Sequence, residues 1–243
     1  MRRAKAQQPA PCAIHRHALA PLLPDAPQSA LSEACEFAAA AGEGAFVDFL
    51  TGQGLAALWG ELIAGSHCEI PLSERARERL HQSRLNATGM YLLQRHNLQS
   101  ATELLAAADV PHATMKGAHC REAYYDSPAL RPARDIDILV KPEDRLRAIR
   151  AFQAAGFDFH ALPQNISHEC NLVKGNTAID LHWDIMRPGR TRQPMAGDLV
   201  DGRTDYGTHN GTSHGATLFL MLVHPVFTKY STTPHASLVR LVD

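Results

Sequence analysis

The chain has 243 residues, with 24 Lys or Arg against 25 Asp or Glu, and its formal net charge is -1. Such a length can bury a sizeable core in one large or two small domains. The balanced charge gives no general electrostatic footprint for nucleic acid and favours a small-molecule, peptide or protein partner. The five cysteines form no C-x-x-C pair and the longest purely apolar run covers only residues 218–223, so we expect a cytoplasmic protein without a membrane-spanning segment.

The N-terminal third predicts an arm followed by helices. Residues 1–28 are rich in Pro, Ala and Gln, a composition typical of a mobile N-terminal arm. From residue 29 to residue 109 the apolar positions recur at helical spacing, which predicts a helical module without a catalytic motif. We expect its helices over residues 29–41, over 54–64, from an N-cap at Ser73 towards Asn97, and over 99–108.

A short apolar strand is predicted at residues 113–117, where it ends in Lys116 and Gly117. A helix is expected to follow over residues 118–125. Glycine allows close approach of the backbone, and the first turn of a helix offers free N–H groups to a phosphate. Lys116 adds a point charge, so this turn is a candidate phosphate-binding site.

Residues 131–140 predict a strand that carries two aspartates on one face. Asp135 and Asp137 occupy alternate positions, while Ile136 and Ile138 point to the opposite, apolar face. Two neighbouring carboxylates repel each other unless a cation lies between them, and oxygen ligands suit Mg²⁺ or Mn²⁺ better than Zn²⁺. The alternative is that the acidic side chains only meet solvent or a nearby arginine.

The next elements predict a helix and a hairpin. Residues 141–144 are typical of a helix start, and the helix is expected to continue to Gly156. Residues 172–183 predict a hairpin with its turn at Lys174-Gly175-Asn176. In its second strand, Asp180 and His182 share the polar face and supply a third carboxylate.

The last part of the chain, residues 187–243, is predicted as a long connection followed by helices. Residues 187–215 are polar, with little regular pattern, and a connection of this length is often functional. Residues 217–224 and 236–242 predict helical segments.

Three segments together resemble a known family: Lys-Gly, Leu-Arg-x-x-x-Asp-Ile-Asp-Ile-Leu-Val, and Ile-Asp-Leu-His-Trp. They are similar to the NTP_transf_5 nucleotidyltransferases, a branch of the DNA polymerase β-like superfamily. The resemblance covers about residues 105–243 and implies an α+β fold with a small mixed β-sheet core at residues 110–186. Lys116-Gly117 replaces the Gly-Ser or Gly-Gly usual in the superfamily, and Asp135 lies eighteen positions after Gly117, more than in most members.

The resemblance implies a two-metal nucleotidyltransferase. Asp135 and Asp137 would bridge two Mg²⁺ or Mn²⁺ ions, and Asp180 would complete the ion beside the acceptor hydroxyl. The donor would be a nucleoside triphosphate, with ATP expected, the acceptor a small molecule, peptide or protein, and the product pyrophosphate. The nucleotide-binding residues would be Lys116, Gly117, Arg131 and Arg134. For both arginines, structural pairing with aspartates is an equal alternative.

Two histidines are candidates for the acceptor side of this site. His182 shares the face of Asp180 and is placed to assist the acceptor or orient a carboxylate, or else to form a structural hydrogen bond at the sheet edge. His168 and its neighbour Glu169 lie on the first hairpin strand, from which they are candidates to reach the site. The fourteen histidines show no zinc-ligand spacing. Two other functions remain open: a nucleotide-binding regulator without turnover, and an interaction partner from a toxin-antitoxin pair or a biosynthetic cluster.

Overall fold

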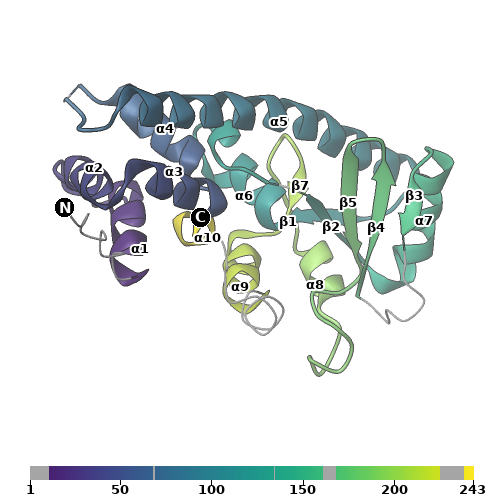
Figure 1. The fold of residues 1–243 in the computed structure, drawn as a ribbon. Helices are drawn as coiled ribbons and strands as arrows, with labels where there is room; N and C mark the ends of the chain where they lie inside the picture. The colour runs from purple at the N-terminus through teal and green to yellow at the C-terminus, as the bar shows by residue number, and fades with distance from the viewer. Residues whose placement is uncertain (1–10, 68, 134, 161–167, 225–237) are drawn as a thin grey trace. The chain divides into compact units, whose positions relative to one another are not determined.

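The computed structural model describes residues 11–67, 69–133, 135–160, 168–224 and 238–243 (Figure 1). Contacts within the chain divide it into two compact units. The first unit consists of Met1–Gly89, Ala129–Arg131 and Ser237–Asp243, and the second of Met90–Pro128 and Pro132–Ala236. The predicted boundaries at residues 28, 109 and 186 therefore differ from the division by contacts, which falls inside a helix.

The first unit is helical. Its core surrounds Trp59, which is completely buried and packs edge-on against Phe46 with ring centroids 5.2 Å apart. The backbone N–H of Val239 donates to the carbonyl of Gln53 at 3.2 Å and brings the last helix into this unit. The helices of this unit are α1 (Pro11–Leu19), η1 (Ala20–Leu22), α2 (Ala30–Ala41), α3 (Glu43–Gly52), α4 (Ala56–Gly65), the first part of α5 (Glu74–Ala107) and α10 (Val239–Val242).

Residues 11–28 differ from the expectation of a mobile arm. They form helix α1 and the short turn η1, and Ala18 is completely buried. The indole Nε1 of Trp59 donates a hydrogen bond of 2.9 Å to the Ala18 carbonyl. The composition of this segment did not predict the helix, because the residue that contacts it, Trp59, lies 41 positions away from Ala18 in the sequence. The rest of the predicted arm, residues 1–10, lies outside the described residues.

Helix α5 is continuous over 34 residues, whereas the sequence predicted a break after Asn97. The residue at the predicted break, Leu98, is only 3 % exposed and belongs to the core of the second unit. No Gly or Pro stands at this point to interrupt the helix, so burial of Leu98 carries it onward. The start was predicted correctly, since the Ser73 hydroxyl accepts a hydrogen bond from the backbone N–H of Ala76.

The second unit is built on a seven-stranded mixed sheet with the order β3-β4-β5-β2-β1-β7-β6. The pairs β2·β5 and β1·β7 are parallel and the others are antiparallel. Together with the helices this confirms the predicted α+β fold with a mixed sheet. The strands are β1 (His112–Met115), β2 (Ile136–Val140), β3 (Asp158–His160), β4 (Glu169–Lys174), β5 (Thr177–His182), β6 (Thr204–Asp205) and β7 (Asn210–Gly211).

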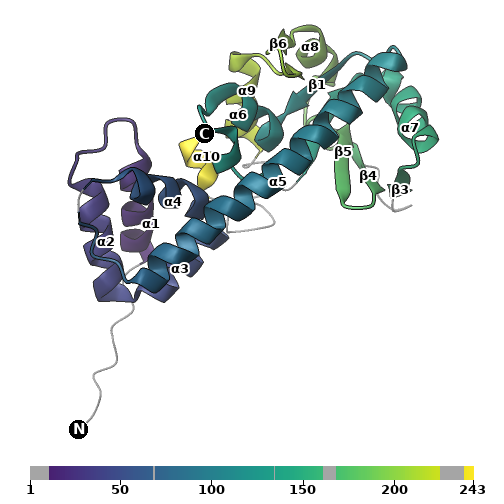
Figure 2. The same ribbon diagram turned by 90° about the horizontal axis from the view of Figure 1, so that it is seen from above.

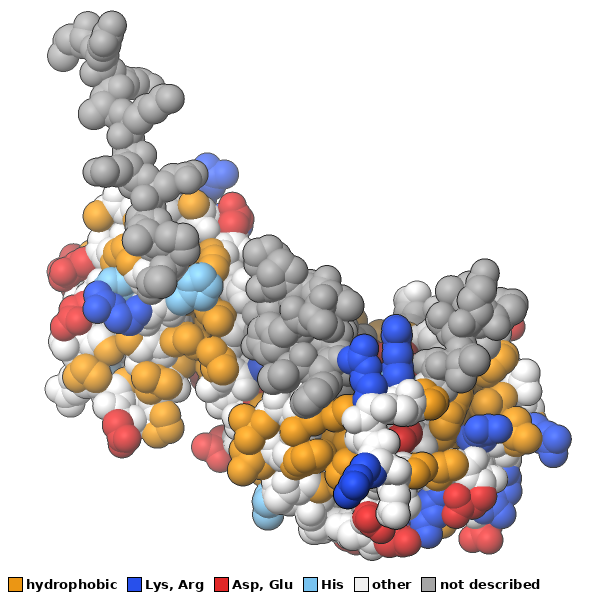
Figure 3. Space-filling view, turned by 90° about the horizontal axis from the view of Figure 1, so that it is seen from below, with side chains coloured by type: hydrophobic (Ala, Val, Ile, Leu, Met, Phe, Trp, Pro, Cys, Tyr) orange, Lys and Arg blue, Asp and Glu red, His pale blue; other side chains and the backbone are white. Residues whose placement is uncertain are grey.

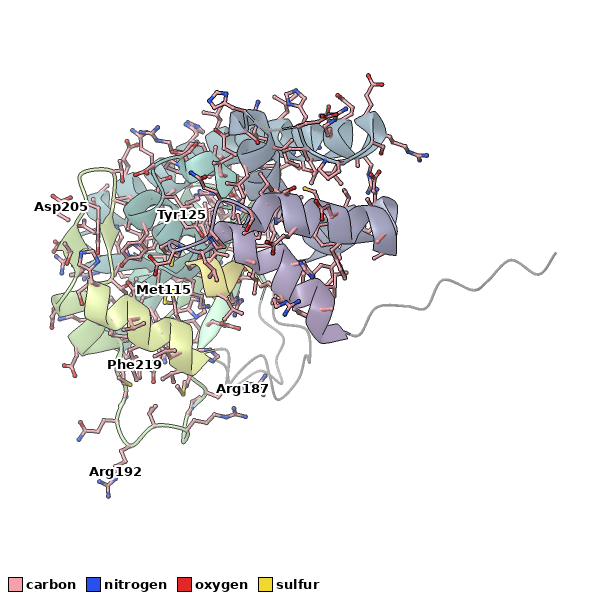
Figure 4. All side chains as sticks on the ribbon, turned by 90° about the vertical axis from the view of Figure 1, so that its left-hand side faces the viewer. Met115, Tyr125, Arg187, Arg192, Asp205 and Phe219 are labelled. Atoms are coloured by element: carbon pink, nitrogen blue, oxygen red, sulfur yellow. The ribbon has the colours of Figure 1, made fainter. Side chains whose placement is uncertain are left out.

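Helices cover both faces of this sheet (Figure 2). One face packs against the second part of α5 and against α7, with Ile136 and Ile138 of β2 in the shared core. On the other face, Met115 of β1 and Phe219 of α9, both labelled in Figure 4, belong to a second core. The helices of this unit that follow α5 are α6 (Lys116–Tyr124), η3 (Pro142–Asp144), α7 (Arg145–Ala154), α8 (Ala196–Asp201) and α9 (His214–His224), and η2 (Pro128–Leu130) lies at the boundary.

The predicted hairpin is confirmed as β4 and β5. Lys174 pairs with Thr177, so the turn contains Gly175 and Asn176. Gly175 has a φ of 56°, a left-handed conformation that glycine adopts at no steric cost. This register sets which face of the sheet Asp180 occupies.

The segment 187–215 contains more structure than the sequence predicted. It forms helix α8 and the two-residue strands β6 and β7. Val200 of α8 is completely buried, and Gly211 of β7 pairs with Thr114 of β1. Strands this short give no periodic signal, and the partner of β7 in β1 is about a hundred residues away. None of the helices of the described residues has the length and apolarity needed to cross a membrane.

On the face drawn in Figure 3, the described Lys and Arg side chains are interspersed with Asp and Glu side chains. This distribution agrees with the balanced net charge of the sequence.

Candidate active site

Three aspartates converge where β2 and β5 lie side by side. Asp137 and Asp180 are direct partners in the parallel register of these strands, and Asp135 immediately precedes β2. One carboxylate oxygen from each aspartate lies within 4.8 Å of the others. Asp137 is buried, Asp180 half-buried and Asp135 exposed. The structure thus brings together the three carboxylates that the sequence identified.

Lys116 reaches this cluster from the neighbouring strand. Met115 pairs with Asp137 across the antiparallel strands β1 and β2, and Lys116 is the next residue. Its Nζ donates to Oδ1 of Asp137 at 2.6 Å. Lys116 has a φ of 56°, which is unusual for a residue with a Cβ and is a kind of strain found at functional sites.

His182 contacts the same carboxylate oxygen from the end of β5. Its Nε2 lies 2.9 Å from Oδ1 of Asp137 and 3.3 Å from Nζ of Lys116. Burial by itself would raise the pKa of Asp137, but the Lys116 ammonium and the His182 hydrogen bond outweigh it and hold this pKa below its usual range. Asp137 is therefore ionised and accepts the Nε2–H of His182.

Asp135 experiences the opposite influence. Desolvation of its carboxyl raises its pKa, and the nearby charges of Asp137 and Asp180 raise it further, partly offset by Lys116.

Two residues of the neighbouring strand β4 contact the site residues, and of these Asn171 was not identified from the sequence. Asn171 is the cross-strand partner of Asp180, and its Nδ2 donates to Oδ1 of Asp180 at 2.6 Å. Oε2 of Glu169 lies 3.1 Å from Nδ1 of His182. The hairpin register already contained this signal, because a turn at Gly175 and Asn176 places Asn171 opposite Asp180.

His168, the weaker of the two histidine candidates, lies close to His182. It is buried, and the two ring centroids are 5.8 Å apart. Its Nε2 lies 3.4 Å from Oε2 of Glu169. Both candidate histidines therefore lie beside the aspartate cluster.

The remaining predicted residues have different positions. Gly117 is the second residue of α6, next to Lys116. Arg131 belongs to the first unit, where its guanidinium forms a buried ion pair with Asp243, with Nε donating to Oδ1 at 2.8 Å. This is the structural pairing that the sequence left open, and a nucleotide contact of Arg131 stays a prediction. Arg134 lies outside the described residues.

The donor atoms of the aspartate cluster fit a hard divalent cation. The set consists of carboxylate oxygens alone, which is the ligand type preferred by Mg²⁺ and Mn²⁺. Desolvation is the main cause that raises the pKa of Asp135, and the charges of Asp137 and Asp180 raise it further, a repulsion of the kind that a cation relieves.

A family profile matches most of this chain. The profile of the family described as uncharacterised nucleotidyltransferase, NTP_transf_5, matches residues 39–224. A structural comparison matches the solution structure of the antibiotic-resistance factor ANT(2'')-Ia, with 12 % identity, a TM-score of 0.42, and coverage of 62 % of this chain and 83 % of that chain. Comparison with curated proteins gave no match.

Proposed function

Because this chain belongs to the NTP_transf_5 family of uncharacterised nucleotidyltransferases, we propose that it moves a nucleoside monophosphate from a nucleoside triphosphate to an acceptor hydroxyl. The observation that carries this proposal is the convergence of Asp135, Asp137 and Asp180 within 4.8 Å. We propose ATP as the donor and a small molecule, peptide or protein as the acceptor. In the reaction, a bond forms between the acceptor oxygen and the α-phosphorus, the bond to pyrophosphate breaks, and the hydroxyl proton is released.

We propose that the three carboxylates hold divalent metal, two Mg²⁺ or Mn²⁺ ions in the active complex. When bound, these ions neutralise the charge of the triphosphate and favour loss of the acceptor proton. The oxygen-only donor set and the raised pKa of Asp135 support this assignment.

The other residues of the site position and charge the carboxylates. Lys116 and His182 both donate to one oxygen of Asp137, so they keep it ionised and fix its orientation. Asn171 fixes Asp180 in the same way. Phosphoryl transfer depends mainly on positioning and charge neutralisation, so a site with no protein nucleophile suffices. We further propose that the Lys116 ammonium and the first N–H groups of α6 contact the triphosphate.

The test is pyrophosphate release from each of the four ribonucleoside triphosphates with Mg²⁺ or Mn²⁺, with cell extract as the source of acceptor. Asp137→Asn keeps the shape of the side chain and removes its charge, and we expect it to lower the rate by about 100-fold or more. The matched control is Asp158→Asn, an exposed aspartate of β3 in the same sheet, which is expected to leave the rate unchanged.

Two outcomes would favour the other functions. Metal-dependent nucleotide binding without pyrophosphate release would indicate the regulatory protein. Equal rates for the wild type and Asp137→Asn would contradict a catalytic role for the aspartate cluster. Stable co-purification with a cognate chain, unaffected by Asp137→Asn, would indicate the interaction partner.

A further inference from the structure

A second group of metal-ligand atoms lies beside the aspartates. Ligand atoms of His168, Glu169 and His182 all lie within 4.8 Å of one another. His168 is 5 % exposed and His182 is 1 % exposed, so two of the three side chains are buried. We propose that these three residues bind a first-row transition metal of the Zn²⁺ type, at a site separate from the three carboxylates.

The hydrogen bond between His182 and Asp137 fixes which ring nitrogen is free. Nε2 of His182 donates to Oδ1 of Asp137 at 2.9 Å, which leaves Nδ1 as the ring nitrogen that faces away from the aspartates. Nδ1 lies 3.1 Å from Oε2 of Glu169. The ring of His182 is thus already oriented as a metal ligand.

The contact between His182 and Glu169 also has the geometry of two ligands and not of a hydrogen bond. Nδ1 of His182 is buried and has no hydrogen-bond partner among the described residues, although Oε2 of Glu169 is close. Around a metal ion, each nitrogen lone pair points at the ion and not at the neighbouring donor. A tetrahedral ion with bonds of about 2.0–2.1 Å sets neighbouring donors about 3.3 Å apart. Oε2 of Glu169 lies 3.1 Å from Nδ1 of His182 and 3.4 Å from Nε2 of His168.

The surroundings of His182 match those of a metal ligand. A metal-bound histidine almost always donates its other ring N–H to a carboxylate, a carbonyl or water, which fixes the ring and raises its basicity. Asp137 is that carboxylate here. Two imidazoles and one carboxylate suit Zn²⁺ and related ions, whereas Mg²⁺ prefers oxygen ligands alone. The Glu169 side chain is 42 % exposed, so an ion can enter from solvent.

The sequence did not predict this site because its ligands have no recognisable spacing. His168 and Glu169 are neighbours at the start of β4, and His182 ends β5. The antiparallel register pairs Glu169 with His182 and so brings the three side chains together.

The test measures zinc binding by the metal-free full chain, in competition with a chromophoric chelator and in a large excess of Mg²⁺ that occupies the aspartates. We expect one saturable zinc site, and Co²⁺ in the same site should give visible absorption bands typical of low coordination number. His168→Ala and Glu169→Gln should each weaken zinc binding by about 100-fold. Glu169 is partly exposed, so Glu169→Gln keeps the test valid if His168→Ala fails to fold, which circular dichroism would show.

Two control variants locate the ion. His81→Ala removes an exposed histidine of α5 and should leave zinc binding unchanged. Asp135→Asn removes a carboxylate of the aspartate cluster and should also leave it unchanged. The proposal would be overturned by the absence of saturable zinc binding, by unchanged affinity in both His168→Ala and Glu169→Gln, or by loss of zinc binding in Asp135→Asn. None of these readouts depends on turnover, so the proposal stands or falls independently of the proposed function.

Discussion

Asp137 and Asp180 are direct neighbours across the parallel strands β2 and β5, although helix α7 and the strands β3 and β4 separate them in the chain. Each is fixed by a donor from a further strand or strand end, Lys116 for Asp137 and Asn171 for Asp180. The sheet therefore assembles the candidate site, because β2 and β5 carry Asp137 and Asp180, while β4 and the end of β1 supply the residues that hydrogen-bond to them.

The ion pair between Lys116 and Asp137 should stabilise the fold in a pH-dependent way. Lys116→Met leaves His182 as the partner of the buried Asp137 side chain within the part of the chain that the structure describes, and it should lower the free energy of unfolding by about 1–3 kcal/mol at neutral pH. The pKa of Asp137 is lowered in the fold, so this contribution is present above its unfolded value near 3.9 and is lost as the pH falls below it. Urea unfolding from pH 7 to pH 3 measures the difference.

Lys141→Met is the matched control for this experiment. It removes an exposed lysine that pairs with Asp201 on the surface, and it should produce no resolvable change. A loss of the same size in both variants, or a loss in Lys116→Met that does not shrink towards pH 3, would contradict the prediction.

Desolvation, together with the repulsion from Asp137 and Asp180, should make Asp135 a destabilising residue in the absence of metal. Its pKa is raised in the fold, so the ionised form destabilises the folded state above the usual carboxyl range, and Asp135→Asn should raise the melting temperature of the metal-free protein at neutral pH. The same variant should lose the increase in melting temperature that Mg²⁺ produces in the wild type. Differential scanning fluorimetry with and without Mg²⁺ tests both effects. Asp158→Asn should change neither, and a metal-free Asp135→Asn that melts below the wild type would refute the assignment.

Two buried histidines should make the protein sensitive to mild acid. His119 and His209 form a hydrogen bond of 2.9 Å between Nδ1 and Nε2, and burial is the main cause that lowers their pKa values to about 3 and about 4. Below about pH 6.5 the unfolded chain binds more protons than the folded one. The free energy of unfolding should therefore decrease as the pH is lowered, by up to about 1.4 kcal/mol per pH unit for each histidine.

Chemical denaturation at half-unit steps from pH 7.5 to pH 4.5 measures this slope. His209→Gln removes one of the two groups that take up a proton on unfolding, so the slope should fall by up to about 1.4 kcal/mol per pH unit. His81→Ala, which replaces an exposed histidine of α5, should leave the slope unchanged. A stability that does not vary across this pH range would show that neither buried histidine remains neutral in the folded protein.

The same histidine pair should make Gly211 irreplaceable. A Cβ at this position would overlap Nδ1 of His119 and lie 2.9 Å from Nε2 of His209. Gly211→Ala should therefore lower the free energy of unfolding by about 1–3 kcal/mol, because the buried rings must move. Gly197→Ala in α8, where a Cβ meets nothing within 4 Å, should be neutral or slightly stabilising. Equal melting temperatures for the two variants would mean that the histidine pair is loosely packed.

Local pattern was enough to predict a large part of this molecule. The alternation of Asp135 and Asp137 with isoleucines fixed one polar face of β2, and the turn at Gly175 fixed the hairpin that carries Asp180. The motifs of these strands also identified the family. These features depend on neighbouring residues, whose side-chain period and turn chemistry can be read directly from the chain.

Tertiary structure decided the features that depend on distant partners. Packing of α1 against the core around Trp59 orders this helix, and the core contacts of Leu98 carry α5 past the predicted break. The adjacency of β2 and β5 places three carboxylates together. The ion pair of Lys116 and the cluster of His168, Glu169 and His182 have the same origin. Sequence by itself determined which faces are polar and which family the chain resembles. The meeting of those faces was decided by packing, because strand order depends on burial summed over the whole sheet and not on any local pattern.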